Sequence, residues 1–274
     1  MKTLYKLLVL FSISILHISC EDEIKVDLNT ALPKLVIDAS IRWEKGTLGN
    51  EQKIKLTTTT SYYSAIIPTV SGAIVSITNS SNTIFTFTEI PNTGEYLCTD
   101  FVPVINETYT LMVQYAGQIY TSSEKLLATP NIEDIQQTVV QGFGGDEIQV
   151  KFFYQDNGSE INKYLIGVKN STLVVPEYGV IKDEFFQGNQ MFGFYTNEDL
   201  AQGHILSFSL TGISGRYYNY MNKLLSISGS SGGSPFATPP ATLRGNIINT
   251  IDDANYPLGF FSVSEIDKLD YIVQ

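Results

Sequence analysis

The sequence contains few of the residues that stabilise small exported folds through covalent or metal bonds. Two cysteines, Cys20 and Cys98, and two histidines, His17 and His204, occur in 274 residues. A disulfide scaffold needs several cysteine pairs, and a histidine-rich zinc site needs several histidines. The sequence therefore excludes both. Cys98 alternates with Tyr96 in a strand-like run, so we interpret it as a small core residue.

Positive charge is also scarce. The chain has 17 Lys and Arg against 28 Asp and Glu, which gives a formal net charge of −11 at pH 7. Proteins bind nucleic acid through clustered Lys and Arg that neutralise phosphates. No such cluster occurs in the sequence, so nucleic acid is not expected as a partner.

The apolar run at the N-terminus is too short to cross a bilayer. It covers residues 7–16, whereas a membrane helix needs about 20 apolar residues. Lys2 and Lys6 precede the run, and Ser19-Cys20 closes it. This order of a positive region, an apolar region and a small residue is typical of an export signal. We predict that residues 1–19 are a lipoprotein signal peptide.

Cys20 is the expected site of lipidation. A small residue directly before a cysteine marks lipoprotein processing, in which the thiol is diacylated and the chain is cut before the cysteine. Each buried acyl methylene contributes about 0.8 kcal/mol, so two or three chains form a lasting anchor. The alternative is an ordinary secretory signal with a chance cysteine, because His17 stands where lipoprotein signals usually have Leu. In the lipoprotein interpretation, residues 20–31 form an acidic lipidated linker in which Glu21, Asp22 and Glu23 directly follow Cys20.

Branched and aromatic residues dominate the rest of the chain, which contains 16 Tyr and 15 Phe. Such side chains fit the pleated, half-buried surface of a β-sheet, so the fold class is predicted to be mainly β with few helices. Apolar residues alternate from Leu35 to Trp43, which indicates a strand with one buried side. Roughly seven such strands, with hairpin turns expected at Asn79 to Asn82 and at Ala116-Gly117, predict an antiparallel sandwich of immunoglobulin or transthyretin type over residues 32–127.

Residues 128–274 are predicted to form a second β-rich domain with one or two short helices. Strands over 147–154 and 164–169 are expected to form a hairpin across Asn157-Gly158, because that pair suits a tight turn with positive φ. One helix is expected to begin near Ser214, which can cap its first turn. Its apolar residues recur at helical spacing, and two closing strands are expected at 259–263 and 269–273.

A resemblance to a known family rests on four separated features that occur in the family's order. The four features are Ser19-Cys20 with its acidic followers; Pro33-Lys34-Leu35-Val36-Ile37-Asp38; Ser71-Gly72-Ala73-Ile74-Val75 through Gly94-Glu95-Tyr96 and Thr108-Tyr109-Thr110-Leu111; and Pro235-Phe236, Gly245-Asn246-Ile247 and Leu258-Gly259-Phe260-Phe261-Ser262-Val263. Together they resemble the Bacteroidetes surface lipoproteins called domain of unknown function 4249 (DUF4249).

The resemblance implies an outer-membrane lipoprotein that faces the cell exterior. Such proteins are often encoded beside a TonB-dependent receptor and have an amino-terminal immunoglobulin-like part. Glu21, Asp22 and Glu23 resemble the export tag that directs Bacteroidetes lipoproteins to the outer face; by itself, the charge run indicates only a solvated leash. The family has no catalytic residues to transfer to this chain.

Two short motifs suggest enzymes but lack the required context. Residues 229–233 match G-x-S-x-G, the nucleophile elbow of serine hydrolases, which needs a preceding strand, a following helix and a later histidine. Here a helix precedes, prolines follow and His204 comes earlier. Gly142, Gly144 and Gly145 are followed by a strand instead of a helix, so they do not predict a phosphate-binding loop.

Three acidic doublets could in principle supply an acid and a base for glycoside hydrolysis. Neighbours on a strand point to opposite faces, so we interpret each doublet as solvated turn chemistry. Asp252, Asp253 and Asn255 offer hard oxygen ligands, but their spacing matches no full calcium loop. The doublets are Asp146-Glu147, Asp183-Glu184 and Asp252-Asp253.

Exposed tyrosines are the candidate ligand or partner contacts. Tyr62 and Tyr63 are expected in a loop, and Tyr218 near the helix start. Tyrosine buries a large area and can form a hydrogen bond at its tip, which suits protein interfaces and ligand capture. Tyr217 and Tyr220 are equally well explained as core residues.

These observations favour a non-enzymatic accessory or ligand-binding partner of a TonB-dependent transporter. No cofactor or metal is expected, and the expected partners are the membrane lipid, through acylated Cys20, and the receptor. A surface adhesin or structural lipoprotein is the first alternative, and a glycan or peptide hydrolase is the second.

Overall fold

The alternation of apolar and polar residues produces an almost entirely β structure, as predicted. The computed structural model describes residues 32–61, 64–142, 144–228 and 243–274, of which residues 33–274 form one unit. The elements are β1 (Leu35–Glu44), β2 (Gln52–Thr58), β3 (Ile74–Asn79), β4 (Ile84–Ile90), β5 (Glu95–Cys98), β6 (Thr108–Tyr115), β7 (Gln118–Lys125), β8 (Ile132–Gln141), β9 (Asp146–Gln155), β10 (Lys163–Asn170), β11 (Glu177–Lys182), β12 (Gln190–Thr196), β13 (Ile205–Gly212), α2 (Gly215–Ser228), β14 (Ile248–Asn249) and β15 (Leu258–Ile272).

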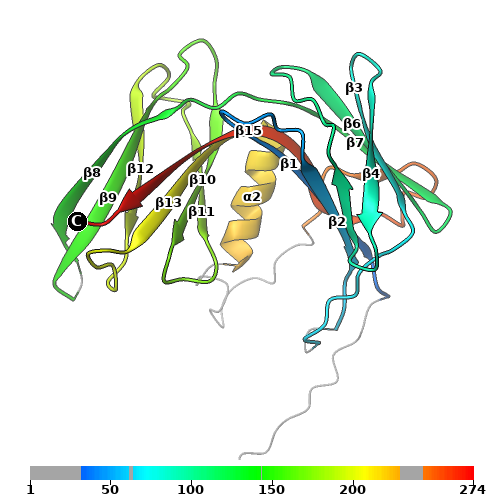
Figure 1. The fold of residues 1–274 in the computed structure, drawn as a ribbon, viewed down its shortest axis with the longest axis horizontal. Coiled ribbons are helices and arrows are strands. Elements are labelled where there is room, and N and C mark those ends of the chain that lie inside the picture. The colour runs from blue at the N-terminus through cyan, green and yellow to red at the C-terminus, as the bar shows by residue number, and fades with distance from the viewer. Residues whose placement is uncertain (1–31, 62–63, 143, 229–242) are drawn as a thin grey trace, which may run out of the picture. The chain divides into compact units, whose positions relative to one another are not determined.

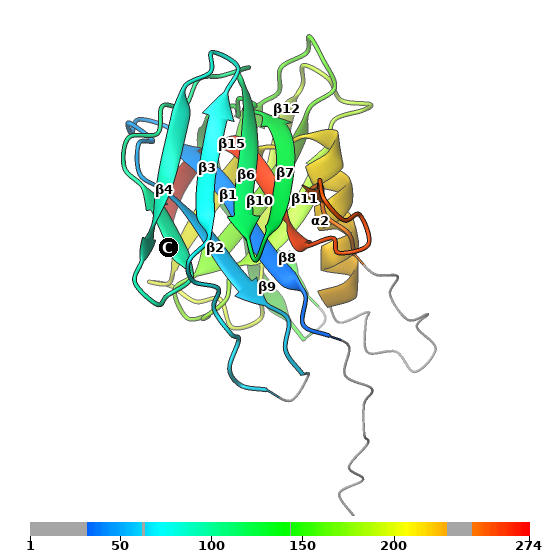
Figure 2. The same ribbon diagram turned by 90° about the vertical axis from the view of Figure 1, so that its right-hand side faces the viewer.

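Strands β1 to β7, β14 and the first half of β15 form a first lobe. Their sheet order is β15-β1-β2-β5-β4-β3-β6-β7-β14, and strands β4, β3, β6 and β7 lie side by side in Figure 2. Strand β4 pairs with β3 up to Phe87 and with β5 from Thr88, so the sheet folds over onto itself there. The two layers enclose a core that includes Ile37, Tyr96 and Cys98. Burial of Cys98 confirms its prediction as a core residue.

Two predicted hairpins of this lobe are confirmed. Strands β3 and β4 pair across a turn in which Asn82 has a φ of 64°. Strands β6 and β7 pair across Ala116 and Gly117, which both have positive φ. Two central residues with positive φ match the right-handed twist of a hairpin.

Strands β8 to β13, helix α2 and the second half of β15 form a second lobe. Strands β12, β9 and β8 make a three-stranded sheet that packs on the layer β11-β10-β13-β15. Helix α2 covers the other side of that layer, where Tyr217 and Met221 pack against Leu165 and Phe260. Strand β10 is therefore buried on both faces, with neighbouring residues Leu165 and Ile166 in different cores.

Strand β15 joins the two lobes, and Figure 1 shows it running from one group of strands to the other. Residues Leu258 to Ile266 pair in parallel with β1, and Ile266 to Ile272 pair antiparallel with β13. The connector between β7 and β8 follows the same strand, since Glu265 N–H donates to Leu127 O at 3.0 Å. The two closing strands predicted near the C-terminus are thus one continuous strand.

The hairpin predicted across Asn157-Gly158 is wrong. Strand β9 pairs with β8 and β12, so neither edge is free for β10, which belongs to the other sheet. Asn157 instead accepts a hydrogen bond from the Ser159 N–H at 3.2 Å, which turns the chain from one layer to the next.

The predicted helix is confirmed as α2. Ser214 Oγ accepts the Tyr217 N–H at 3.2 Å, which satisfies one of the unpaired donors of the first turn. Among the described residues, no helix is both long enough and apolar enough to cross a membrane.

Candidate functional site

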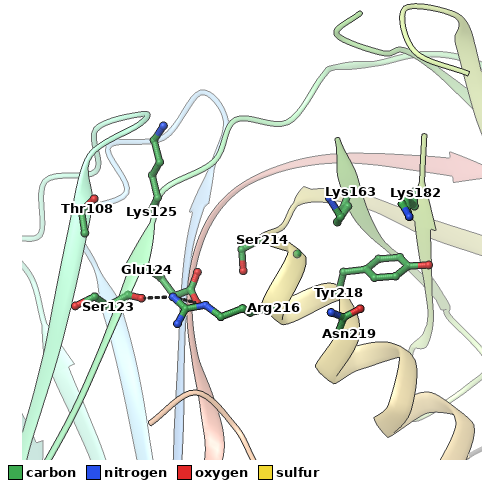
Figure 3. A pocket seen from close by; sticks show the side chains of 11 residues that line it. Thr108, Ser123, Glu124, Lys125, Lys163, Lys182, Ser214, Arg216, Tyr218 and Asn219 are labelled. Atoms are coloured by element: carbon green, nitrogen blue, oxygen red, sulfur yellow. Dashed lines mark hydrogen bonds and ion pairs between the residues drawn. The ribbon is translucent and has the colours of Figure 1, made fainter. Parts of the chain in front are cut away.

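A pocket lies where the end of β7 approaches the start of α2, and Figure 3 shows its side chains. Its volume is about 780 Å³. The walls come from the first lobe on one side and from β10, β11 and α2 of the second lobe on the other. The lining residues are Thr108, Ser123, Glu124, Lys125, Lys163, Lys182, Ser214, Gly215, Arg216, Tyr218 and Asn219. We call this cavity the basic pocket.

Arg216 ties the first turn of α2 to the edge of β7. Its Nη2 donates to the Ser123 carbonyl at 2.7 Å and lies 3.1 Å from Glu124 Oε1. The Arg216 side chain is 64% exposed, whereas that of Glu124 is 4% exposed. The guanidinium therefore spans the seam between the lobes and keeps part of its surface open to a ligand.

Glu124 is the one acidic residue in the lining, and its carboxylate is already engaged. Asn246 Nδ2 donates to Glu124 Oε1 at 2.9 Å, in addition to the contact with Arg216. Burial raises the pKa of Glu124, and the positive charge of Arg216 and hydrogen bonds from Asn246 and Ser214 oppose that shift. The carboxyl group is thus a structural partner of Arg216.

Three lysines complete the positive lining. Lys125 ends β7, Lys163 begins β10 and Lys182 ends β11. Lys182 pairs with Glu184, whereas Lys125 and Lys163 form no ion pair with any described residue. Four cations, two of them paired with Glu124 and Glu184, leave an excess of two positive charges in a protein of net charge −11.

A second cavity of about 750 Å³ lies along the same helix and shares Arg216 and Asn219 with the basic pocket. Its described lining adds Lys223, Arg244 and Tyr220. Six of the chain's basic side chains therefore line cavities next to α2. A field of one sign around a cleft concentrates ligands of the opposite sign.

The chemistry of the basic pocket suits recognition of a negatively charged or acceptor-rich ligand. Arg216 can bind a carboxylate or phosphate through two parallel hydrogen bonds, and the lysine ammonium groups supply further donors. Tyr218 adds an aromatic face and a hydroxyl to the lining of the pocket (Figure 3). Groups of three or more His, Cys, Asp or Glu arranged to hold a metal are absent from the described part of the chain.

The structure places one predicted contact residue in this pocket. Tyr218 lines it, whereas Tyr217 and Tyr220 pack against Phe260, in line with their reading as core residues. Tyr62 and Tyr63 lie outside the described residues. The same holds for Cys20 with Glu21, Asp22 and Glu23, and for the motif at 229–233.

The other candidate motifs take local structural roles. His204 Nδ1 accepts the Ala201 N–H at 3.4 Å just before β13. Asp252 Oδ1 accepts the Ala254 N–H at 3.0 Å in a turn, and both members of the Asp252-Asp253 doublet are exposed. Gly142, Gly144 and Gly145 lie between β8 and β9, and the Gly142 N–H donates to Gly145 O at 2.7 Å.

One acidic doublet was misinterpreted. Asp183 was expected to be solvated, but it is fully buried, whereas its neighbour Glu184 is exposed. The reason is that Asp183 directly follows β11 and accepts the Asn162 N–H at 2.9 Å, which holds it under the loop before β10.

Sequence reasoning did not identify the four cations of the basic pocket. They come from β7, β10, β11 and α2, and any two of them are at least 19 residues apart in the chain. No motif links them. The sequence shows only that Lys and Arg are few in this acidic chain. Which of them lie together depends on the fold.

Fold and site together define a mainly β protein with two lobes and a basic pocket at their junction. The family model described as "Domain of unknown function (DUF4249)" matches residues 21–270, and the chain belongs to this family. No curated protein matches the sequence. Among solved structures, a two fibronectin type-III domain segment from chicken tenascin matches with 12% identity and a TM-score of 0.23, and the match covers 67% of this chain and 91% of that one.

Proposed function

We propose that this protein is a non-enzymatic, lipid-anchored surface protein that captures an anionic ligand and delivers it to a TonB-dependent outer-membrane transporter. The basic pocket is the observation that carries the ligand-binding part. The Ser19-Cys20 signal and the acidic residues 21–23 support the anchor and its outward facing. Membership of the DUF4249 family supports the transporter, by analogy with the gene neighbourhoods of that family.

Ligand binding at the pocket can be tested by charge reversal. The full chain with Lys125→Glu and Lys163→Glu is compared with wild type by calorimetry, with citrate and inorganic phosphate as probes. We expect the affinity to fall at least about tenfold, because each lost attraction near the protein surface is worth on the order of 1 kcal/mol or more. Binding should also weaken at high salt.

A matched control separates a local from a general charge effect. Lys55→Glu with Lys169→Glu changes the net charge equally, but both residues lie outside the basic pocket. The control should keep wild-type affinity within about twofold. Equal loss in both double variants, or no binding of either probe by wild type, would refute the pocket as the ligand site.

The anchor can be tested by substitution of Cys20. Wild-type protein should incorporate labelled palmitate and fractionate with the outer membrane, whereas Cys20→Ala should lose both properties. Protease added to intact cells should cleave the wild-type protein if it faces outward. A wild-type chain that starts elsewhere and carries a free thiol at residue 20 would rule out the anchor.

The transporter partnership needs a separate experiment. Tagged full-length protein is purified in mild detergent, and the co-eluting proteins are identified by mass spectrometry. We expect a large β-barrel receptor in near-stoichiometric amount. If none co-elutes while the protein still binds the anionic probes, the adhesin or structural alternative replaces the transporter part of the proposal.

A further inference from the structure

A buried acidic cluster lies in the second lobe, outside the basic pocket. Asp156 follows β9 and is 4% exposed, and Asp183 follows β11 and is fully buried. The side chain of Asp156 contacts that of Asp183. Two tyrosines of the core, Tyr154 and Tyr164, pack edge to face beside them, with ring centroids 5.2 Å apart.

The two loops that carry the acids are fastened to each other. Asp156 Oδ1 accepts the Tyr164 hydroxyl at 2.6 Å, and Oδ2 accepts the Gly188 N–H at 3.0 Å. Asp183 Oδ2 accepts the Asn162 N–H at 2.9 Å, and its own N–H donates to the Asn162 carbonyl at 3.3 Å. These bonds fix the carboxylates at defined positions, so the cluster is organised before any ligand arrives.

Oxygen atoms without a partner remain in this cluster. Asp183 Oδ1, Asn162 Oδ1 and the Tyr154 hydroxyl are all buried and form no hydrogen bond. Tyr154 is 0% exposed, and its ring packs on that of Tyr164, whose hydroxyl donates to Asp156. Buried polar atoms are normally paired. The Tyr154 hydroxyl can donate a hydrogen bond itself, whereas Asp183 Oδ1 and Asn162 Oδ1 can only accept, so these two oxygens call for an electropositive partner.

The described side chains do not supply that positive charge. No Lys, Arg or His within the described ranges forms an ion pair with Asp156 or Asp183. Each uncompensated buried ion costs several kcal/mol.

We propose that Asp156, Asp183 and Asn162 form a binding site for a hard divalent cation, with Ca²⁺ as the best match. Carboxylate and amide oxygens are the ligands that Ca²⁺ prefers, and it accepts irregular geometries from loops. A single shared proton would neutralise one carboxyl group but would leave Asn162 Oδ1 without a partner. A cation satisfies Asn162 Oδ1 and Asp183 Oδ1 at once. The site is independent of the proposed ligand-binding function.

Calcium binding can be measured on the full chain after treatment with EDTA. Calorimetry with CaCl₂ should give a Kd between about 0.1 and 1 mM, the range of extracellular calcium modules. The melting temperature should rise with Ca²⁺ and fall back when chelator is added. Tb³⁺ should show luminescence on tyrosine excitation, since Tyr154 and Tyr164 border the site, and excess Ca²⁺ should quench it.

Asp183→Asn and Asn162→Ala test the assignment, and Asp253→Asn is the control. Asp253 is exposed and belongs to the other oxygen-rich sequence. We expect the first two variants to weaken Ca²⁺ and Tb³⁺ binding at least tenfold and the control to match wild type. If Asp183→Asn does not fold, Asn162→Ala carries the test, because it removes one ligand oxygen and keeps the backbone bonds.

Two results would overturn the proposal. Wild-type protein that neither binds Ca²⁺ nor gains thermal stability from it would show that a proton neutralises the acid pair instead. Loss of binding in Asp253→Asn with full binding in Asp183→Asn would move the cation to the turn at 252–255.

Discussion

Glu124 is a buried carboxyl group at the junction of the lobes, and its pKa is raised. Its burial favours the neutral form, while Arg216 and Asn246 favour the charged form. Arg216 is mostly exposed, so solvent screens its attraction, and exposed pairs contribute about 0 to 1 kcal/mol. The balance leaves a group that stabilises the fold more when it is protonated than when it is charged.

This balance predicts a pH dependence for Glu124→Gln. A carboxyl with a raised folded pKa contributes stability that is fully present below the unfolded value of 4.5 and is lost as the pH rises through the folded pKa. Glutamine stays neutral throughout. Urea unfolding should therefore show Glu124→Gln gaining stability relative to wild type between pH 4 and pH 7. A difference that stays constant over this range would contradict the prediction.

Cys98 should be nearly inert in the folded protein. Burial, with Asp100 as the second cause, raises the pKa of its thiol to about 11, and the side chain is 1% exposed. The thiolate fraction alone makes its reaction with a disulfide reagent at pH 7 roughly a hundredfold slower than that of a free cysteine. The Cys20→Ala variant isolates this thiol, and denaturant should restore full reactivity. Rapid labelling without denaturant would show that the strand around Cys98 opens.

Strand β15 depends on close backbone contact at its first residues. Gly259 has a φ of 96°, and a Cβ there would collide with the Ile37 carbonyl of β1. A side chain would therefore force both an unfavourable backbone conformation and a separation of the two strands. Glycine at this position allows the parallel pairing that carries β15 across the first lobe.

Gly259→Ala should lower the free energy of unfolding by at least about 2 kcal/mol, from strain plus a lost close contact. Gly179→Ala in β11 is the control, because nothing lies within 4 Å of its Cβ position and its φ is not left-handed. The control should stay within about 0.5 kcal/mol of wild type. Chemical denaturation of both variants measures the difference. Equal stabilities would show that β1 and β15 can move apart at little cost.

The two lobes share their C-terminal residues, so neither is complete by itself. Ile247, Phe261 and Val263 belong to the core of the first lobe, although they follow β8 to β13 and α2 of the second lobe in the chain. Removal of one large core side chain already costs about 3 to 5 kcal/mol, a large part of the net stability of a domain. Strand β1 would also lose its parallel neighbour.

A fragment of residues 33–127 is therefore expected to lack a cooperative thermal transition. Addition of residues 243–274 as a separate chain should restore one, since these residues supply β15 and the missing core. Calorimetry and near-ultraviolet circular dichroism measure both states. A fragment that melts cooperatively at the temperature of the full chain would show that the first lobe folds independently of β15.

The sequence alone determined the features that depend on neighbouring residues. The alternation of apolar and polar residues predicted β1, and turn residues predicted the hairpins β3–β4 and β6–β7. Ser214 and the helical spacing of the apolar residues after it predicted α2. Cys98 and Tyr217 were placed in the core for the same local reason. These features can be predicted because the hydrophobic period of each element and the residues of each turn depend on consecutive positions in the chain.

Tertiary structure decided the features that depend on distant partners. It assigned β9 and β10 to different sheets, merged two predicted strands into β15, and buried Asp183 beside Asp156. It also gathered the cations of the basic pocket from four elements. The alternation within a strand shows which face is buried but not which strand pairs with its edge. The burial of a side chain and the charged groups beside it are therefore decided only when the strands pair.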